Sequence, residues 1–144
     1  ATGFALAAKR RSLKFNSYAL LSDGELDEGS NWEAILFAPH HNLDNLTCIV
    51  DYNKLQSLTT VKETLNLEPL KDKLSSFGWN IFDIDGHDHT EIKNSLTAKT
   101  NKPKFIIANT IKGKGVSFME NKVVWHYRSA NEEELSIGLK ELEE

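Results

Sequence analysis

Four short apolar runs alternate along the chain with longer segments that carry apolar residues at helical spacing. Each run has the length of a buried strand, and together they span residues 17–22, 46–50, 80–84 and 104–108. Strands that alternate with helices are typical of α/β proteins, in which the strands form a parallel sheet. The pattern therefore predicts a doubly wound, mainly parallel sheet with helices on both faces. The first run is expected to be buried on both faces of that sheet.

Local signals indicate where the first helices begin and end. Residues 1–12 are rich in alanine, which favours a helix before the first strand. Ser30 and Glu33 form a capping-box pattern, so a second helix should begin there, and Pro39 should kink or shorten it. The packed face of this second helix is expected to carry Trp32, Ile35 and Leu36.

Further signals lie between the second and fourth strands. Residues 56–64 are rich in serine and threonine and predict a polar loop. Pro69 suits the first turn of a helix that Gly78 would end. Asp88 with Glu91 is expected to cap the next helix. The packed residues of the helix before Gly78 are expected to be Leu70, Leu74 and Phe77.

Length and charge limit the classes of protein to which the chain can belong. The 144 residues suggest a single domain over 1–144, with an acidic terminal helix at 131–144 that is amphipathic through Leu135, Leu139 and Leu142. The net charge of −4 is spread along the chain, and no basic arm suggests a nucleic-acid partner. No apolar stretch reaches the ~18 residues of a membrane span and no signal peptide opens the chain, so we expect a cytoplasmic protein. Cys48 has no partner for an internal disulfide, and we expect a buried, inert thiol.

Polar residues follow the first two predicted strands and suggest a binding site. Asp23-Gly24 ends the first apolar run, and Asn53 follows the second run 30 positions later. In a parallel sheet these strand ends lie close together at the carboxyl edge, where open α/β sheets bind ligands. Carboxylate and amide oxygens suit magnesium or calcium, and Gly24 would allow the backbone to approach a phosphate. Taken alone, the Asp and the Asn are better explained as ordinary turn residues.

Six segments together resemble one known family. The spacing of Asp23-Gly24 and Asn53 resembles the thiamine diphosphate signature of transketolase-like enzymes, and the wording of segments 23–34, 42–46, 51–56, 77–79, 85–88 and 110–115 resembles the amino-terminal half of transketolase. The likeness runs from Ala1 to about Arg128 and is greatest to transketolases split into two polypeptides. Ser22 stands where the family usually has glycine. Residues 1–7 resemble a helix that follows a glycine-rich cofactor loop in the family, so we expect that the domain lacks its first part.

The resemblance implies roles for individual residues. Asp23, the Asn53 side chain and the Leu55 backbone carbonyl would hold the metal, and Gly24 would contact the diphosphate. Two diphosphate oxygens and a water would complete the octahedral coordination that magnesium prefers. His126 lies in a Trp-His pair that reaches the diphosphate and the substrate in the family, although from the residues alone it would be an ordinary, partly buried histidine. Glu28 matches a carboxylate at the subunit interface.

The resemblance also implies an activity and a partner. Transketolases transfer a two-carbon ketol unit between sugar phosphates, and the glutamate that activates the cofactor belongs to a pyrimidine-binding domain. We find no such domain here, so we expect a homo- or hetero-oligomer that is active only with a pyrimidine-domain subunit. Two alternatives stay open, which are a non-catalytic scaffold or regulatory subunit and another thiamine diphosphate enzyme. The sequence does not identify the donor and acceptor sugars.

The remaining chemical candidates have simpler explanations. The other histidines form no metal-binding spacing and are expected at helix ends or in loops, namely His40, His41, His87 and His89. Residues 112–115, Lys-Gly-Lys-Gly, lack the spacing of a nucleotide-binding loop. We interpret them either as a flexible segment that closes over the diphosphate or as a plain exit from the fourth strand.

Overall fold

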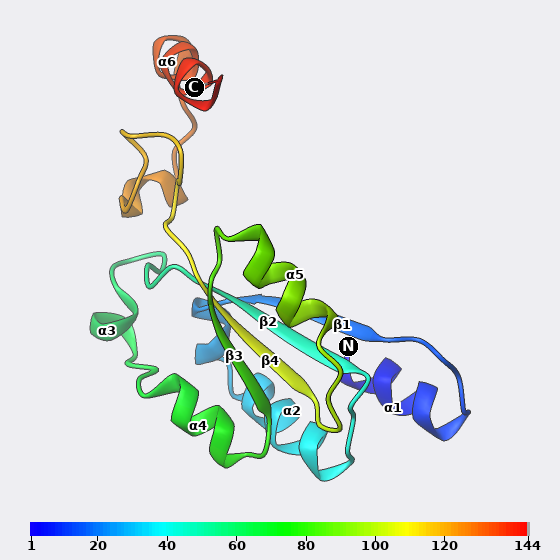
Figure 1. The fold of residues 1–144 in the computed structure, drawn as a ribbon. Helices are drawn as coiled ribbons and strands as arrows, with labels where there is room; N and C mark the ends of the chain where they lie inside the picture. The colour runs from blue at the N-terminus through cyan, green and yellow to red at the C-terminus, as the bar shows by residue number, and fades with distance from the viewer. Residues whose placement is uncertain (144) are drawn as a thin grey trace.

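A four-stranded parallel sheet forms the centre of the molecule (Figure 1). The computed structural model describes residues 1–143. The strands lie in the spatial order β1-β2-β4-β3, and their bounds are Ser17–Ser22 (β1), Leu46–Tyr52 (β2), Asn80–Asp85 (β3) and Lys104–Asn109 (β4). All four predicted strands are therefore present, and the parallel α/β sheet is confirmed.

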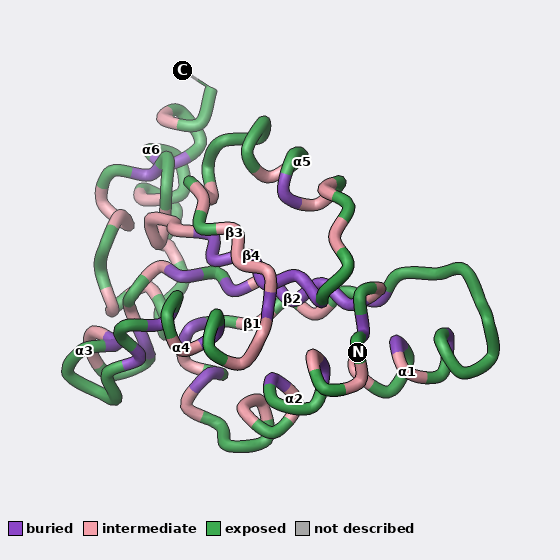
Figure 2. The backbone as a smooth tube through the Cα atoms, turned by 60° about the horizontal axis from the view of Figure 1, so that its bottom comes forward, coloured by how far each residue is buried: buried purple, intermediate pink, exposed green. Residues whose placement is uncertain are grey.

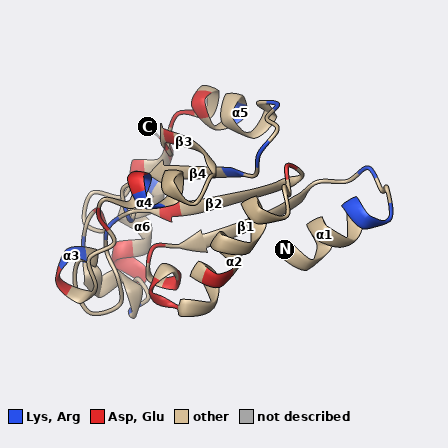
Figure 3. Cartoon of the chain, turned by 90° about the horizontal axis from the view of Figure 1, so that it is seen from below, with Lys and Arg blue, Asp and Glu red and all other residues tan. Residues whose placement is uncertain are grey.

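Helices cover both faces of the sheet (Figures 1 and 3). On one face lie α1 (Thr2–Arg10), α2 (Gly29–His40) and α4 (Leu70–Ser76), and on the other lies α5 (His89–Thr97). The chain crosses the sheet in one direction from β1 through β2 to β3 and then returns to β4. Because parallel crossovers are right-handed, the helix on the return connection is placed on the opposite face. Three short or outlying elements complete the fold before the tail, and these are η1 (Gly24–Asp27), α3 (Val61–Thr64) and η2 (Val123–His126).

The main core lies between the sheet and the helices α1, α2 and α4 (Figure 2). Trp79 joins two layers, since its indole N–H donates to the Ile35 carbonyl at 2.8 Å and its ring meets Phe105 edge-on at 5.3 Å. The interior strands β2 and β4 are almost wholly buried. Cys48 lies in this core, which confirms its expected burial, and burial raises the pKa of its thiol to about 12.

Three local expectations are wrong. Strand β1 is not buried on both faces, because Tyr18 and Leu20 are exposed on the α5 side. Helix α5 packs mainly on β3 and leaves Tyr18 and Leu20 of β1 exposed, which the apolar run alone could not reveal. Leu36 is also exposed, and α2 begins at Gly29 with Glu28 as its N-cap rather than with a Ser30 capping box.

Two local signals are confirmed, and two others differ in detail. The Asp88 carboxylate accepts from the backbone N–H groups of Thr90 and Glu91 and caps α5. Gly78 has a φ of +98° directly after the end of α4, a left-handed conformation that favours glycine. Pro69 is the N-cap of α4 rather than a residue within its first turn. The expected polar loop at 56–64 contains the short helix α3.

The tail forms the terminal helix α6 (Glu132–Glu143), and Glu144 of the predicted helix lies outside the described residues. Gly138 is buried against Val116. The apolar residues at which the helix was expected to be amphipathic are exposed, namely Leu135, Leu139 and Leu142. Within residues 1–143, the helices are all too short or too polar to cross a lipid bilayer.

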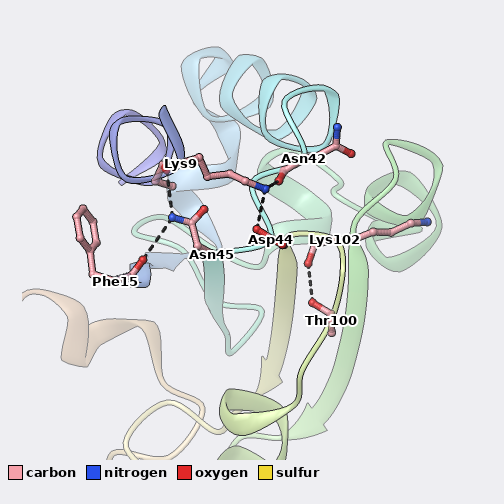
Figure 4. Close-up of polar contacts among 8 residues, drawn as sticks. Lys9, Phe15, Asn42, Asp44, Asn45, Thr100 and Lys102 are labelled. Carbon is pink, nitrogen blue, oxygen red and sulfur yellow. Dashed lines mark hydrogen bonds and ion pairs between the residues drawn. The ribbon is translucent and has the colours of Figure 1, made fainter. Parts of the chain in front are cut away.

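The amino edge of the sheet is closed by hydrogen bonds between distant segments (Figure 4). The Asn45 amide donates to the backbone carbonyls of Ala5 at 3.1 Å and Phe15 at 3.4 Å. The Lys9 ammonium pairs with Asp44 at 2.8 Å and also donates to the Asn42 carbonyl. These contacts fasten α1 to the loop that leads into β2.

Candidate functional site

The carboxyl ends of β1 and β2 bring the predicted metal ligands together. The strand register pairs Ser22 with Asp51, so β1 and β2 end at the same edge of the sheet. The Asp23 carboxylate crosses between them and accepts from the Lys54 backbone N–H at 2.7 Å. The Asn53 side-chain oxygen accepts from the Leu55 N–H at 3.0 Å, which orients the Asn53 amide within its own turn.

All six residues singled out from the sequence line one cleft of about 540 Å³ at this edge, namely Asp23, Gly24, Glu28, Asn53, Leu55 and His126. A larger cleft of about 680 Å³ adjoins it and shares Asn53 and Leu55. We assign the chemistry to the smaller cleft, because only that cleft contains the buried carboxylate and the histidine. The structure therefore gathers the predicted residues, although this placement by itself does not assign their roles.

Asp23 is a buried carboxylate with few compensating charges. Its side chain is 2% exposed, and burial raises the pKa of Asp23 above its usual value. Hydrogen bonds from the Lys54 and Gly24 N–H groups act in the opposite direction, while the neighbouring carboxylates of Asp51 and Asp27 raise the pKa further. A cation beside Asp23 would stabilise the ionised form.

Acidic groups dominate the lining of the cleft. Four carboxylates face one ammonium and one imidazole, in the set Asp23, Glu25, Glu28, Asp51, Lys112 and His126. Glu25 accepts from the Ser22 backbone N–H at 2.8 Å, and Asp51 accepts from the Thr110 hydroxyl. A polyanionic ligand would meet repulsion here unless a multivalent cation entered with it.

His126 lies at the end of η2 between two polar partners. Its Nδ1 is 3.5 Å from the Lys112 ammonium, and its Nε2 is 3.4 Å from the Ser57 hydroxyl. An ammonium has only hydrogens to offer, so Nδ1 acts as the acceptor in this pair. In the neutral ring the proton then resides on Nε2, which can donate to an oxygen in the cleft.

Gln56 and Lys112 are among the lining residues that were not identified from the sequence. Gln56, interpreted as part of a polar loop, is buried, and its amide nitrogen has no hydrogen-bond partner among residues 1–143. Lys112 was interpreted only within a glycine-rich segment. It follows β4, so the rule that parallel strand ends meet at one edge could have identified it. His87 has a loop role here, since its Nε2 accepts from the Ile111 N–H at 2.8 Å and supports the segment that leads to Lys112.

The residues present fit a divalent cation and a diphosphate. Asp23, Asn53 and the Leu55 carbonyl are hard oxygen donors. Leu55 and Thr60 form an isolated antiparallel bridge whose hydrogen bonds are made by the neighbouring residues. The Leu55 carbonyl takes no part in these bonds. A Cβ at Gly24 would meet only the Gln56 side chain at 3.7 Å, so the fold itself does not require glycine there. No group of three or more His, Cys, Asp or Glu side chains suited to a metal occurs within residues 1–143, and this ligand set contains only one such side chain.

Comparison with known families agrees with this geometry. The family model described as the transketolase thiamine diphosphate binding domain matches residues 6–142. The chain belongs to the transketolase family. The resemblance found in the sequence is therefore confirmed, and the match extends past Arg128 into α6.

Individual transketolases show how much of such a protein the chain represents. It is 41% identical over 146 residues to an apulose-4-phosphate transketolase subunit of Actinobacillus succinogenes, covering 100% of this chain and 53% of that protein. It is 42% identical over 146 residues to the 6-deoxy-6-sulfo-D-fructose transketolase subunit SqwG of Clostridium sp. strain MSTE9, covering 99% of this chain and 53% of that protein. The crystal structure of Campylobacter jejuni transketolase matches with a TM-score of 0.93 and 32% identity, over 99% of this chain and 24% of that one. The chain thus spans about half the length of the Actinobacillus and Clostridium subunits.

Proposed function

We propose that this chain is the diphosphate- and metal-binding part of an enzyme that transfers a two-carbon ketol unit between sugars or sugar phosphates. The observation that carries the proposal is the convergence of Asp23, Gly24, Asn53 and His126 on one acid-lined cleft. When bound, thiamine diphosphate supplies the nucleophilic carbon and the electron sink for ketol transfer. The protein then supplies binding, orientation and electrostatics.

Each residue of the cleft has a part in this proposal. Asp23, Asn53 and the Leu55 carbonyl would hold Mg²⁺ or Ca²⁺, whose charge would offset those of the buried carboxylate and the diphosphate. Gly24 lets the diphosphate approach the backbone. His126 donates from Nε2 to a diphosphate or substrate oxygen, and Lys112 adds the one ammonium of the lining.

A second polypeptide completes the site in this proposal. The relatives from Actinobacillus succinogenes and Clostridium are both named as transketolase subunits, which supports such a partner for this chain. The partner would supply a pyrimidine-binding domain with its activating carboxylate. Glu28 is exposed at the start of α2 on the rim of the cleft, where it can contact that partner.

The requirement for a cation provides the test. We expect the assembled protein to bind thiamine diphosphate in isothermal titration with Mg²⁺ or Ca²⁺ present, and to lose that binding after chelation. Sodium chloride at matched ionic strength controls for general screening of the acidic lining. Equal affinity with and without the divalent cation would contradict the proposal.

A further inference from the structure

An exposed tyrosine links two loops that are distant in the sequence. The Tyr127 hydroxyl donates to the Ser57 backbone carbonyl at 2.6 Å, across 70 positions of the chain. The Tyr127 side chain is 66% exposed, so burial of its ring explains little of its position. The hydrogen bond to Ser57 therefore determines where the side chain lies, and it links the loop after β2 to the segment around η2.

The link bears directly on His126. Ser57 accepts the Tyr127 hydrogen bond through its carbonyl and lies 3.4 Å from His126 Nε2 through its own hydroxyl. The rings of His126 and Tyr127 also meet edge-on, with centroids 5.1 Å apart. Ser57, His126 and Tyr127 thus form a closed set of contacts, and two of its members line the cleft.

Trp125 and His126 lie in η2, and Tyr127 follows them as its C-cap. A 3₁₀ turn has three residues per turn, so the Trp125 and His126 side chains point about 120° apart. Trp125 donates its indole N–H to the Phe118 carbonyl at 3.0 Å, and the Arg128 guanidinium stacks on its ring at 4.4 Å. Tyr127 reaches the opposite loop, and His126 lies between these two anchors.

We propose that Tyr127 is a positioning residue, which fastens the η2 segment to Ser57 and thereby holds His126 over the diphosphate site. The inference rests on the proposed function, since it concerns the same cleft. The hydroxyl is the essential group and the ring serves as a spacer. Without the hydroxyl the two loops move independently, and His126 loses its fixed distance from the opposite wall of the cleft.

The variant Tyr127→Phe removes the hydroxyl and keeps the ring, and Tyr18→Phe is the matched control on an exposed tyrosine of β1. Both variants are assembled with the natural partner. Hydrogen–deuterium exchange is measured without cofactor, and the dissociation constant of thiamine diphosphate is measured with Mg²⁺. We expect Tyr127→Phe to exchange faster in residues 54–60 and 122–128 and to bind the cofactor about 2- to 10-fold more weakly, the effect of one ordinary hydrogen bond. The melting temperature of Tyr127→Phe should stay unchanged. Tyr18→Phe should change neither the exchange rates nor the cofactor affinity.

The outcomes separate this inference from the proposed function. Unchanged exchange in Tyr127→Phe would overturn the link, and faster exchange with unchanged cofactor affinity would overturn the positioning role. A wild-type protein that does not bind thiamine diphosphate would refute the proposed function together with the role of Tyr127 in it. In that case the exchange data would still show whether the link between the two loops exists.

Discussion

Similar polar residues have different roles at the amino and carboxyl edges of the sheet. At the amino edge, the Asn45 amide nitrogen and Lys9 make bonds within the chain that fasten α1 in place, while the Asn45 amide oxygen is buried without a partner among residues 1–143 (Figure 4). At the carboxyl edge, Asp23 is buried beside other carboxylates, and the Gln56 amide nitrogen is buried without a partner. A polar group whose bonds are made within the chain stabilises the fold, whereas a buried carboxylate beside other carboxylates, found only at the carboxyl edge in this comparison, costs stability unless a cation pairs with it. The difference predicts that substitutions at the two edges affect different measurements.

The largest effect is expected from Asp23→Ala in the assembled protein. Loss of a metal ligand leaves the diphosphate charge uncompensated, so thiamine diphosphate affinity should fall at least about 10- to 100-fold, the range seen even for groups that only support metal ligands. Isothermal titration with Mg²⁺ measures it. Asp44→Ala removes a carboxylate from the amino edge, where it pairs with Lys9 on the surface, and should leave affinity unchanged. Equal affinity in Asp23→Ala and wild type would make Asp23 a turn residue only.

A smaller loss of affinity is expected from Gly24→Ala. The added Cβ meets no backbone atom of the chain and lies at ordinary contact distance from Gln56. The free energy of unfolding should therefore change by less than about 1 kcal/mol. Against a bound diphosphate the same methyl group should cost about 1–2 kcal/mol, or about 5- to 30-fold in affinity. Gly3→Ala, in α1 near the amino edge, has open space around its Cβ and is the control. A Gly24→Ala protein with wild-type affinity would place the diphosphate elsewhere.

The opposite result is expected at the amino edge. Asn45→Ala removes the amide that holds the Ala5 and Phe15 carbonyls, so the free energy of unfolding should fall by about 1 kcal/mol. Urea unfolding measures this change, and thiamine diphosphate affinity should stay the same. Asn101→Ala, on an exposed loop before β4, is the matched control for stability. A loss of affinity in Asn45→Ala would mean that the two edges are coupled.

The sequence predicted features whose causes are local or follow from parallel topology. The Asp88 cap and the Gly78 helix end depend on a few neighbouring residues. The meeting of Asp23 with Asn53 follows from the rule that parallel strands end at the same edge. The family resemblance, in turn, singled out His126, which lies 103 positions from Asp23 and for which spacing gave no signal.

Features that depend on what covers a surface could not be predicted. Tyr18 and Leu20 belong to an apolar run that looks like an interior strand, but their exposure depends on how far α5 extends over the sheet. The Asn45 bonds join residues 30 and 40 positions apart, and the Tyr127 link joins residues 70 positions apart. A single sequence contains no local pattern for such contacts.

The smallest effect is expected at the outer end of the carboxyl edge, where α6 docks on the segment after β4. The Glu141 carboxylate accepts from the Ser117 backbone N–H and hydroxyl, each at 2.6 Å, and these bonds lower the pKa of Glu141 from its ordinary value of 4.5. A lowered carboxyl pKa gives a contribution that is fully present above the ordinary value and is lost as the pH falls through the lowered one. Hydrogen exchange of α6 should therefore accelerate, after correction for intrinsic rates, as the pH falls below about 4.5. Glu141→Gln should remove this pH dependence while Glu133→Gln, on the same helix, should keep it. An α6 whose protection follows the same pH profile in all three proteins would show that Glu141 does not hold the helix in place.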